Sequence, residues 1–71
     1  MEISKKKAQQ IIKKRIGQIT QATNIKEVQN YEYFAHGAAN AMWELDIFTQ
    51  AEHTENYDNI TAVAKKRMGE F

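Results

Sequence analysis

Apolar residues recur at helical spacing in three separate segments of this chain. In the first, Ser4 is a candidate N-cap, and Thr23 and Asn24 form a break in the pattern. Between them, apolar residues fall on one helical face: Ala8, Ile11, Ile12, Ile16 and Ile19. This spacing predicts a first helix over about residues 5–22.

The second segment has the most regular periodicity. Asn24 and Glu27 have the spacing of a capping box, in which the carboxylate reaches back to the cap N–H. A 3-4-3-4-3 pattern of apolar residues follows: Val28, Tyr31, Ala35, Ala38, Met42 and Leu45. Three more widen this stripe on one side: Phe34, Ala41 and Phe48. The pattern predicts a helix over about residues 25–47, with a waist of small residues that suits close crossing by another helix.

The third segment begins at a second capping box, Thr49 and Glu52. Its apolar face is formed by Tyr57, Ile60, Val63, Ala64 and Met68. The basic run 65–67 before Gly69 suits the negative end of a helix dipole. We therefore expect a third helix over about residues 50–68.

These elements predict an all-α fold, a single domain over residues 1–71 made of an antiparallel helical hairpin and a third helix. A chain this short buries only about 60% of its unfolded surface, so its own core is small. It has no cysteine, which excludes disulfides as a source of stability. We therefore expect good helix packing or a homodimer, formed through the small waist of the second helix.

Charge is sorted along the chain. Residues 1–26 carry a net charge of +6, residues 27–58 carry −7 and contain no Lys or Arg, and residues 59–71 carry +2. A nearly neutral chain sorted in this way uses its charge to dock helices against each other or against a partner. The basic first helix beside the acidic second one favours the antiparallel hairpin.

Residues 31–66 contain several distinctive runs: Tyr31-Glu32-Tyr33-Phe34, Gly37, the junction Leu45-Asp46-Ile47-Phe48-Thr49-Gln50-Ala51-Glu52 and Tyr57-Asp58-Asn59-Ile60. With these runs, the segment resembles small all-helical accessory proteins of phages and prophages in Gram-positive bacteria. The junction is also similar to C-terminal helical-pair modules in which a Leu-Ile-Thr turn precedes an acidic helix. Those families have glycine where this chain has Asp46. The resemblance implies a mobile-element protein that manipulates a host machine, including anti-defence inhibitors, and implies no catalytic residue.

Catalysis and metal binding find little support in the residue types. The chain has no Cys, its one Ser is a candidate cap, and neither His has an orienting triad. The residues Glu32, His36, Asn40 and Glu44 climb one helix face at four-residue intervals. A metal needs three or four ligands that converge on a point, which a ladder on one straight helix does not supply. We expect no enzyme, no cofactor and no metal.

Protein binding is the favoured function, because helix two carries aromatic residues that lie off the apolar stripe. Tyr33 and Trp43 are of the types that anchor interfaces, and His36 and Asn40 lie beside them. The acids of the region 44–58 would attract a basic host protein, such as a nucleic-acid enzyme. The expected partner-binding residues are Tyr33, His36, Asn40, Trp43, Glu44, Glu52, Glu55 and Asp58.

A small DNA-binding regulator is the alternative. Basic residues of the first helix would neutralise phosphates: Lys5, Lys6, Lys7, Lys13, Lys14 and Arg15. A recognition helix at the junction 45–49 is disfavoured, because Glu52, Glu55 and Asp58 give it the wrong charge for the major groove. The sequence does not choose between a first helix that contacts nucleic acid and one that only docks on the second helix.

No secretory signal or membrane-spanning run is visible in the sequence, because polar residues interrupt the apolar ones throughout residues 8–19. A cytoplasmic location is the expectation. The identity of the partner, the source organism and the number of subunits lie beyond what the sequence encodes.

Overall fold

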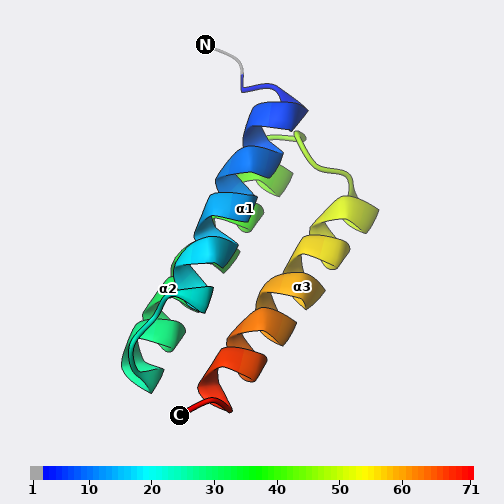
Figure 1. The fold of residues 1–71 in the computed structure, drawn as a ribbon. Coiled ribbons are helices and arrows are strands. Elements are labelled where there is room, and N and C mark those ends of the chain that lie inside the picture. Colours follow the sequence, from blue (N-terminus) through cyan, green and yellow to red (C-terminus); the bar gives the residue numbers. More distant parts are fainter. Residues whose placement is uncertain (1–2) are drawn as a thin grey trace.

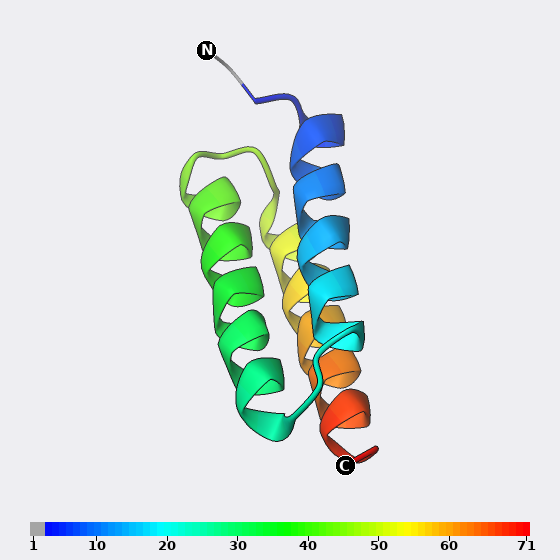
Figure 2. The same ribbon diagram turned by 60° about the vertical axis from the view of Figure 1, so that its left-hand side comes forward.

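The computed structural model describes residues 3–71 as three helices that run side by side, up, down and up (Figures 1 and 2). Helix α1 spans Lys5–Thr20, α2 spans Ile25–Glu44 and α3 spans Gln50–Met68. Each helix packs against the other two. The predicted all-α hairpin with a third helix is thus confirmed. Met1 and Glu2, which the predicted domain includes, lie outside the described residues.

Three polar side chains start the three helices, at the positions that the sequence indicates. Ser4 Oγ accepts a hydrogen bond from the Lys7 N–H (3.1 Å), and Asn24 Oδ1 accepts one from the Glu27 N–H (2.8 Å). Thr49 and Glu52 form the complete reciprocal capping box. The capping box predicted at Asn24 and Glu27 forms differently. Instead of accepting from the N–H of the cap residue Asn24, Glu27 Oε1 accepts from the N–H and the hydroxyl of Thr23, one residue earlier, both at 2.8 Å. These hydrogen bonds lower the pKa of Glu27 below its usual value.

The first two helices end earlier than predicted, at Thr20 and Glu44 instead of residues 22 and 47. At the end of α2 the Ile47 N–H donates to the Met42 carbonyl (2.9 Å), and the Asp46 N–H donates to the Trp43 carbonyl (3.0 Å). This pair of bonds is a Schellman motif, which turns the chain out of the helix through one left-handed residue. That residue is Asp46, with φ 60°, so residues 45–47 lie outside the helix.

Replacing Asp46 by glycine should stabilise the fold by about 0.5 kcal/mol, because glycine adopts positive φ without the steric cost that an L-residue bears. We expect a higher midpoint in thermal unfolding followed by circular dichroism. Glu44→Gly is the matched control, since the same change inside the last helical turn should destabilise by about 1 kcal/mol. A lower midpoint for Asp46→Gly would show that the aspartate side chain contributes more to the turn than its backbone strain costs.

The core is small and rich in alanine. Among residues 3–71, eleven apolar residues are buried, and five of them are alanines: Ala8, Ala22, Ala35, Ala39 and Ala64. The largest fully buried side chains are Ile19, Val28 and Ile60. Short alanine side chains let the three helices approach closely, but they remove little apolar surface from water.

The predicted core stripe of α2 is only partly correct. Val28, Ala35 and Met42 are buried as predicted. Phe34 and Leu45 are 54% and 65% exposed, and Ala41 is also exposed, while Ala39 lies in the core instead. The reason is that α2 packs against both α1 and α3, so its buried face points between these two helices. Phe34 and Leu45 lie to one side of that face and stay exposed. Tyr57 of α3, predicted as apolar face, is likewise 51% exposed.

Candidate functional site

The face where α2 meets α3 carries two aromatic–imidazole pairs. The ring of Trp43 stacks on the ring of His53, with centroids 4.5 Å apart and an interplanar angle of 8°. About two helical turns away, the ring of His36 lies 4.4 Å from the ring of Tyr57, tilted by 33°. Each pair joins one residue of α2 to one of α3. We call these four residues the aromatic face.

Both pairs leave the larger ring partly open to solvent. Trp43 is 39% exposed and Tyr57 is 51% exposed, whereas both histidines are half-buried. The Nδ1 atoms of His36 and His53 are buried and have no hydrogen-bond partner. The imidazoles therefore serve as supports, which hold the indole and the phenol in fixed orientations on the surface.

His36 is more enclosed than the sequence suggested. Its Nε2 lies 3.3 Å from Thr61 Oγ1 and 3.5 Å from Glu32 Oε2. Both contacts are made by Nε2, whereas Nδ1 is buried without a hydrogen-bond partner. Within residues 3–71, no group of three His, Asp or Glu side chains gathers to hold a metal ion. His36 thus lies between Tyr57, Thr61 and Glu32, where α2 meets α3.

Glu52 is also engaged within the fold. Its Oε1 lies 2.8 Å from Lys5 Nζ and accepts a hydrogen bond from the Thr49 N–H (2.9 Å). The hydrogen bond from Lys5 and the one from the Thr49 N–H lower the pKa of this carboxyl below its usual value. The pair ties the start of α1 to the start of α3.

We expect Glu52→Gln to make thermal stability less dependent on pH. Because the pKa of Glu52 in the folded protein lies below the ordinary glutamate value of 4.5, the charged form stabilises the fold above pH 4.5. This contribution is lost as the pH falls through the folded pKa. Midpoints of thermal unfolding at pH 7, 5, 4 and 3 should therefore show wild type above Glu52→Gln at pH 7, with a gap that closes in acid. A gap of constant size would contradict the pKa shift.

The remaining predicted partner-binding residues are exposed. Tyr33 is 77% exposed on the outer side of α2, and Asn40 and Glu44 follow on the same side. On α3, Glu55 and Asp58 are exposed on the outer side of the helix. The prediction that Tyr33 and Trp43 lie outside the core is confirmed. Sequence reasoning missed Tyr57 and His53, whose roles follow from the pairing of α2 with α3.

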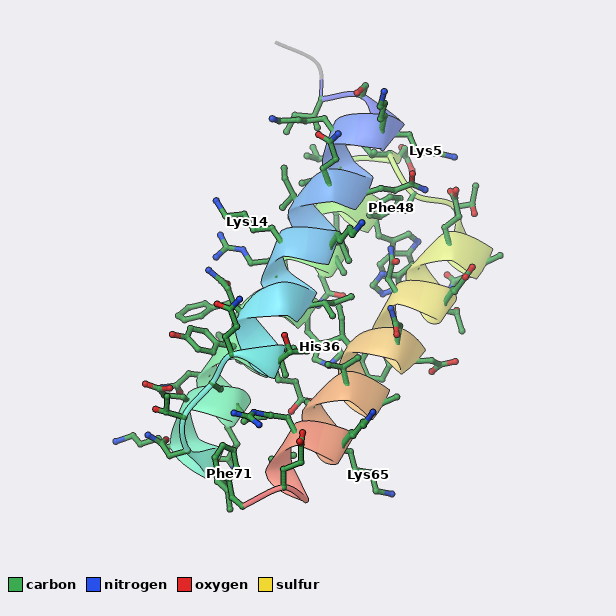
Figure 3. The ribbon with its side chains drawn as sticks, in the orientation of Figure 1. Lys5, Lys14, His36, Phe48, Lys65 and Phe71 are labelled. Carbon is green, nitrogen blue, oxygen red and sulfur yellow. The ribbon has the colours of Figure 1, made fainter. Side chains whose placement is uncertain are left out.

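The lysines of α1 do not dock on α2. Among the charged groups of residues 3–71, the ion pairs are Lys5 with Glu52, His36 with Glu32, and Arg67 with Glu70. Arg15 Nη1 donates to the side-chain oxygen of Gln18 (3.3 Å). All five lysines of α1 are exposed, and four of them form no ion pair within residues 3–71: Lys6, Lys7, Lys13 and Lys14. Figure 3 shows Lys14 pointing away from the bundle.

The chain matches no protein-family model, no curated protein and no solved structure. Its function is therefore inferred from the geometry of its own residues. None of the three helices within residues 3–71 has the length and apolar character that a bilayer crossing needs. A shallow depression between α1 and α3 is lined by Gln9, Ile12, Lys13, Ile16, Asn56 and Asn59. Its open shape offers no enclosed site for chemistry.

Proposed function

We propose that this protein acts without catalysis, by binding a basic protein through its aromatic face. The observation that carries the proposal is the pair of supported rings, Trp43 on His53 and Tyr57 on His36. Trp and Tyr are the residue types most enriched among side chains that dominate binding energy. A ring that is already fixed loses little conformational entropy when a partner covers it, which favours affinity.

The charge beside the aromatic face supports a basic partner. Glu44 directly follows Trp43 in the sequence, and Glu55 and Asp58 lie within two residues of Tyr57, about 160° and 100° from it around the axis of α3. All three are exposed, and none forms an ion pair within residues 3–71. Exposed acids around an aromatic centre raise the association rate with a positively charged surface. The resemblance to phage accessory proteins suggests the context, a host factor such as a nucleic-acid-handling enzyme that the protein inhibits or recruits.

Nucleic-acid binding through α1 is the second candidate, and it rests on a different observation. The exposed lysines Lys6, Lys7, Lys13 and Lys14 have no ion pair within residues 3–71. They could neutralise phosphates, and such binding would weaken steeply as salt is raised. Lys5 contributes less to this surface, because Glu52 already compensates its charge.

Trp43→Ala should lower the affinity for the protein partner at least tenfold, because it removes one supported ring and the area that it buries. The test is affinity capture from a nuclease-treated Gram-positive lysate, with each captured protein quantified by mass spectrometry. Phe71→Ala is the matched control, since Phe71 is 53% exposed but lies beyond the end of α3, whereas Trp43 stacks on His53 near the start of that helix (Figure 3). The proposal requires a partner that wild type and Phe71→Ala retain and Trp43→Ala loses.

Two other outcomes would contradict the proposal. Equal capture by wild type and Trp43→Ala would remove the aromatic face from the binding site. Nucleic-acid binding would be favoured instead if nuclease treatment abolished capture. The same capture should then be lost when Lys6, Lys7, Lys13 and Lys14 are replaced by glutamine. All the substituted side chains are partly or fully exposed, so we expect each variant to stay folded. Circular dichroism of each variant checks that its helix content is unchanged.

A further inference from the structure

A second apolar surface lies on α2, on the other side of the helix from the aromatic face. Phe34, Ala38 and Ala41 of α2, and Leu45 at its C-cap, fall within about 60° of one another around the helix axis, given about 100° per residue. Phe34 and Leu45 are 54% and 65% exposed, Ala41 is exposed, and Ala38 is half-buried. We call these four residues the apolar stripe. Nothing in the proposed function uses it.

We propose that the apolar stripe is the seam of a homodimer in which α2 of one copy packs antiparallel to α2 of a second copy. The spacing of the four residues along the chain is 4-3-4, which is the same in both directions. Large residues stand at the two ends and alanines in the middle. An antiparallel two-fold therefore places Phe34 beside Leu45 of the partner, and Ala38 beside Ala41 of the partner, as a self-complementary interface requires.

One copy exposes more surface than a compact monomer of its mass. The chain exposes 5137 Å², whereas a monomer of its 8.2 kDa mass is expected to expose about 4,500 Å². The exposed side chains of Phe34 and Leu45 contribute to this apolar surface, which a second copy would cover. The Cα radius of gyration, 12.1 Å, likewise exceeds the ~11 Å of a compact domain of this length.

The middle of the stripe is open enough for a second helix. Gly37 lies beside the two alanines, and a Cβ atom added to it would meet no other atom within 4 Å. Glycine is a poor helix former, and the packing inside one copy does not require it here. Small residues at the crossing point let two helices approach at the short end of normal distances, with the large residues interlocking on either side.

Leu45→Lys should raise the dimer dissociation constant at least about 100-fold, because the new charge enters the seam twice, once from each copy. Lysine suits the end of α2, where it faces the negative end of the helix dipole, so the monomer should stay folded. Ala62→Lys is the matched control, since it adds the same charge at an exposed position of α3. Sedimentation equilibrium at about 1 to 200 µM protein, a range that suits a micromolar dissociation constant, measures the dimerisation of wild type and of both variants.

A second measurement tests the orientation with the seam intact. In a mixture of differently labelled copies, isotope-filtered NMR should show magnetisation transfer between the Phe34 ring and the Leu45 methyl groups of the partner. Within one copy these residues are about 16 Å apart along the helix, so no signal can arise there. A monomer at every concentration, a dimer that Leu45→Lys leaves unchanged, or transfer from Phe34 only to Phe34 would each overturn the proposal. None of these results depends on the partner of the aromatic face.

Discussion

Ile60→Ala is expected to bring the protein close to unfolding at room temperature. Ile60 is fully buried at the centre of α3, and removing its outer carbons leaves a cavity among helices that cannot all close in. The cost should be about 3 kcal/mol. A domain of this length has a total stability of only about 4–10 kcal/mol. Urea unfolding followed by circular dichroism should show a much lower midpoint with an unchanged slope.

Ile25→Ala is the matched control for this substitution. The same carbons are removed from a side chain that is 46% exposed at the start of α2, so the expected loss is below about 1 kcal/mol. If both variants lost the same stability, the buried position of Ile60 would be contradicted.

Arg67→Ala is expected to cost about 2–3 kcal/mol, although Arg67 lies close to the end of the chain. Its Nη2 and Nε atoms both donate to the carbonyl of Ala22, at 2.6 and 3.1 Å. Ala22 is itself fully buried, in the connector between α1 and α2. Truncating Arg67 therefore leaves a carbonyl without its donors and detaches α3 from that connector. Chemical unfolding and amide hydrogen exchange in residues 20–24 measure the two effects.

Two comparison variants make this result specific. Lys66→Ala, at an exposed neighbouring position, should change stability by no more than about 0.5 kcal/mol. Arg67→Lys keeps the charge but loses the planar fork, so it should recover less than half of the loss. Equal stability of Arg67→Ala and Lys66→Ala would show that the two hydrogen bonds contribute nothing measurable.

The sequence predicted the helices well because their ends depend on local chemistry. Ser4, Asn24 and Thr49 cap the helices within a few residues of their own positions, so each cap is visible in the sequence. The end of α2 was missed because an aspartate occupies the left-handed position where glycine is the usual signal. The contact of Arg67 with Ala22 joins residues 45 positions apart, and no local pattern encodes it.

The buried face of α2 was harder to predict for a different reason. Its middle consists of small residues, so the spacing alone does not distinguish Ala38 from Ala39 as the core position. The choice depends on where α1 and α3 both pack, which is a property of the whole fold. The same holds for the aromatic face: Trp43 could be placed outside the core from the sequence, but its stacking on His53 depends on the register between two helices.

The short capped junctions between the helices have a consequence for the way the protein folds. Most of its contacts are between residues close in sequence, and such low contact order is typical of folding within microseconds to milliseconds. The hairpin of α1 and α2 closes through a connector of four residues, 21–24, so it can form early. The hydrogen bonds from Arg67 to Ala22 close a loop of 45 positions and are expected to form after the main barrier. Arg67 would then govern how fast the protein unfolds, and have little influence on how fast it folds.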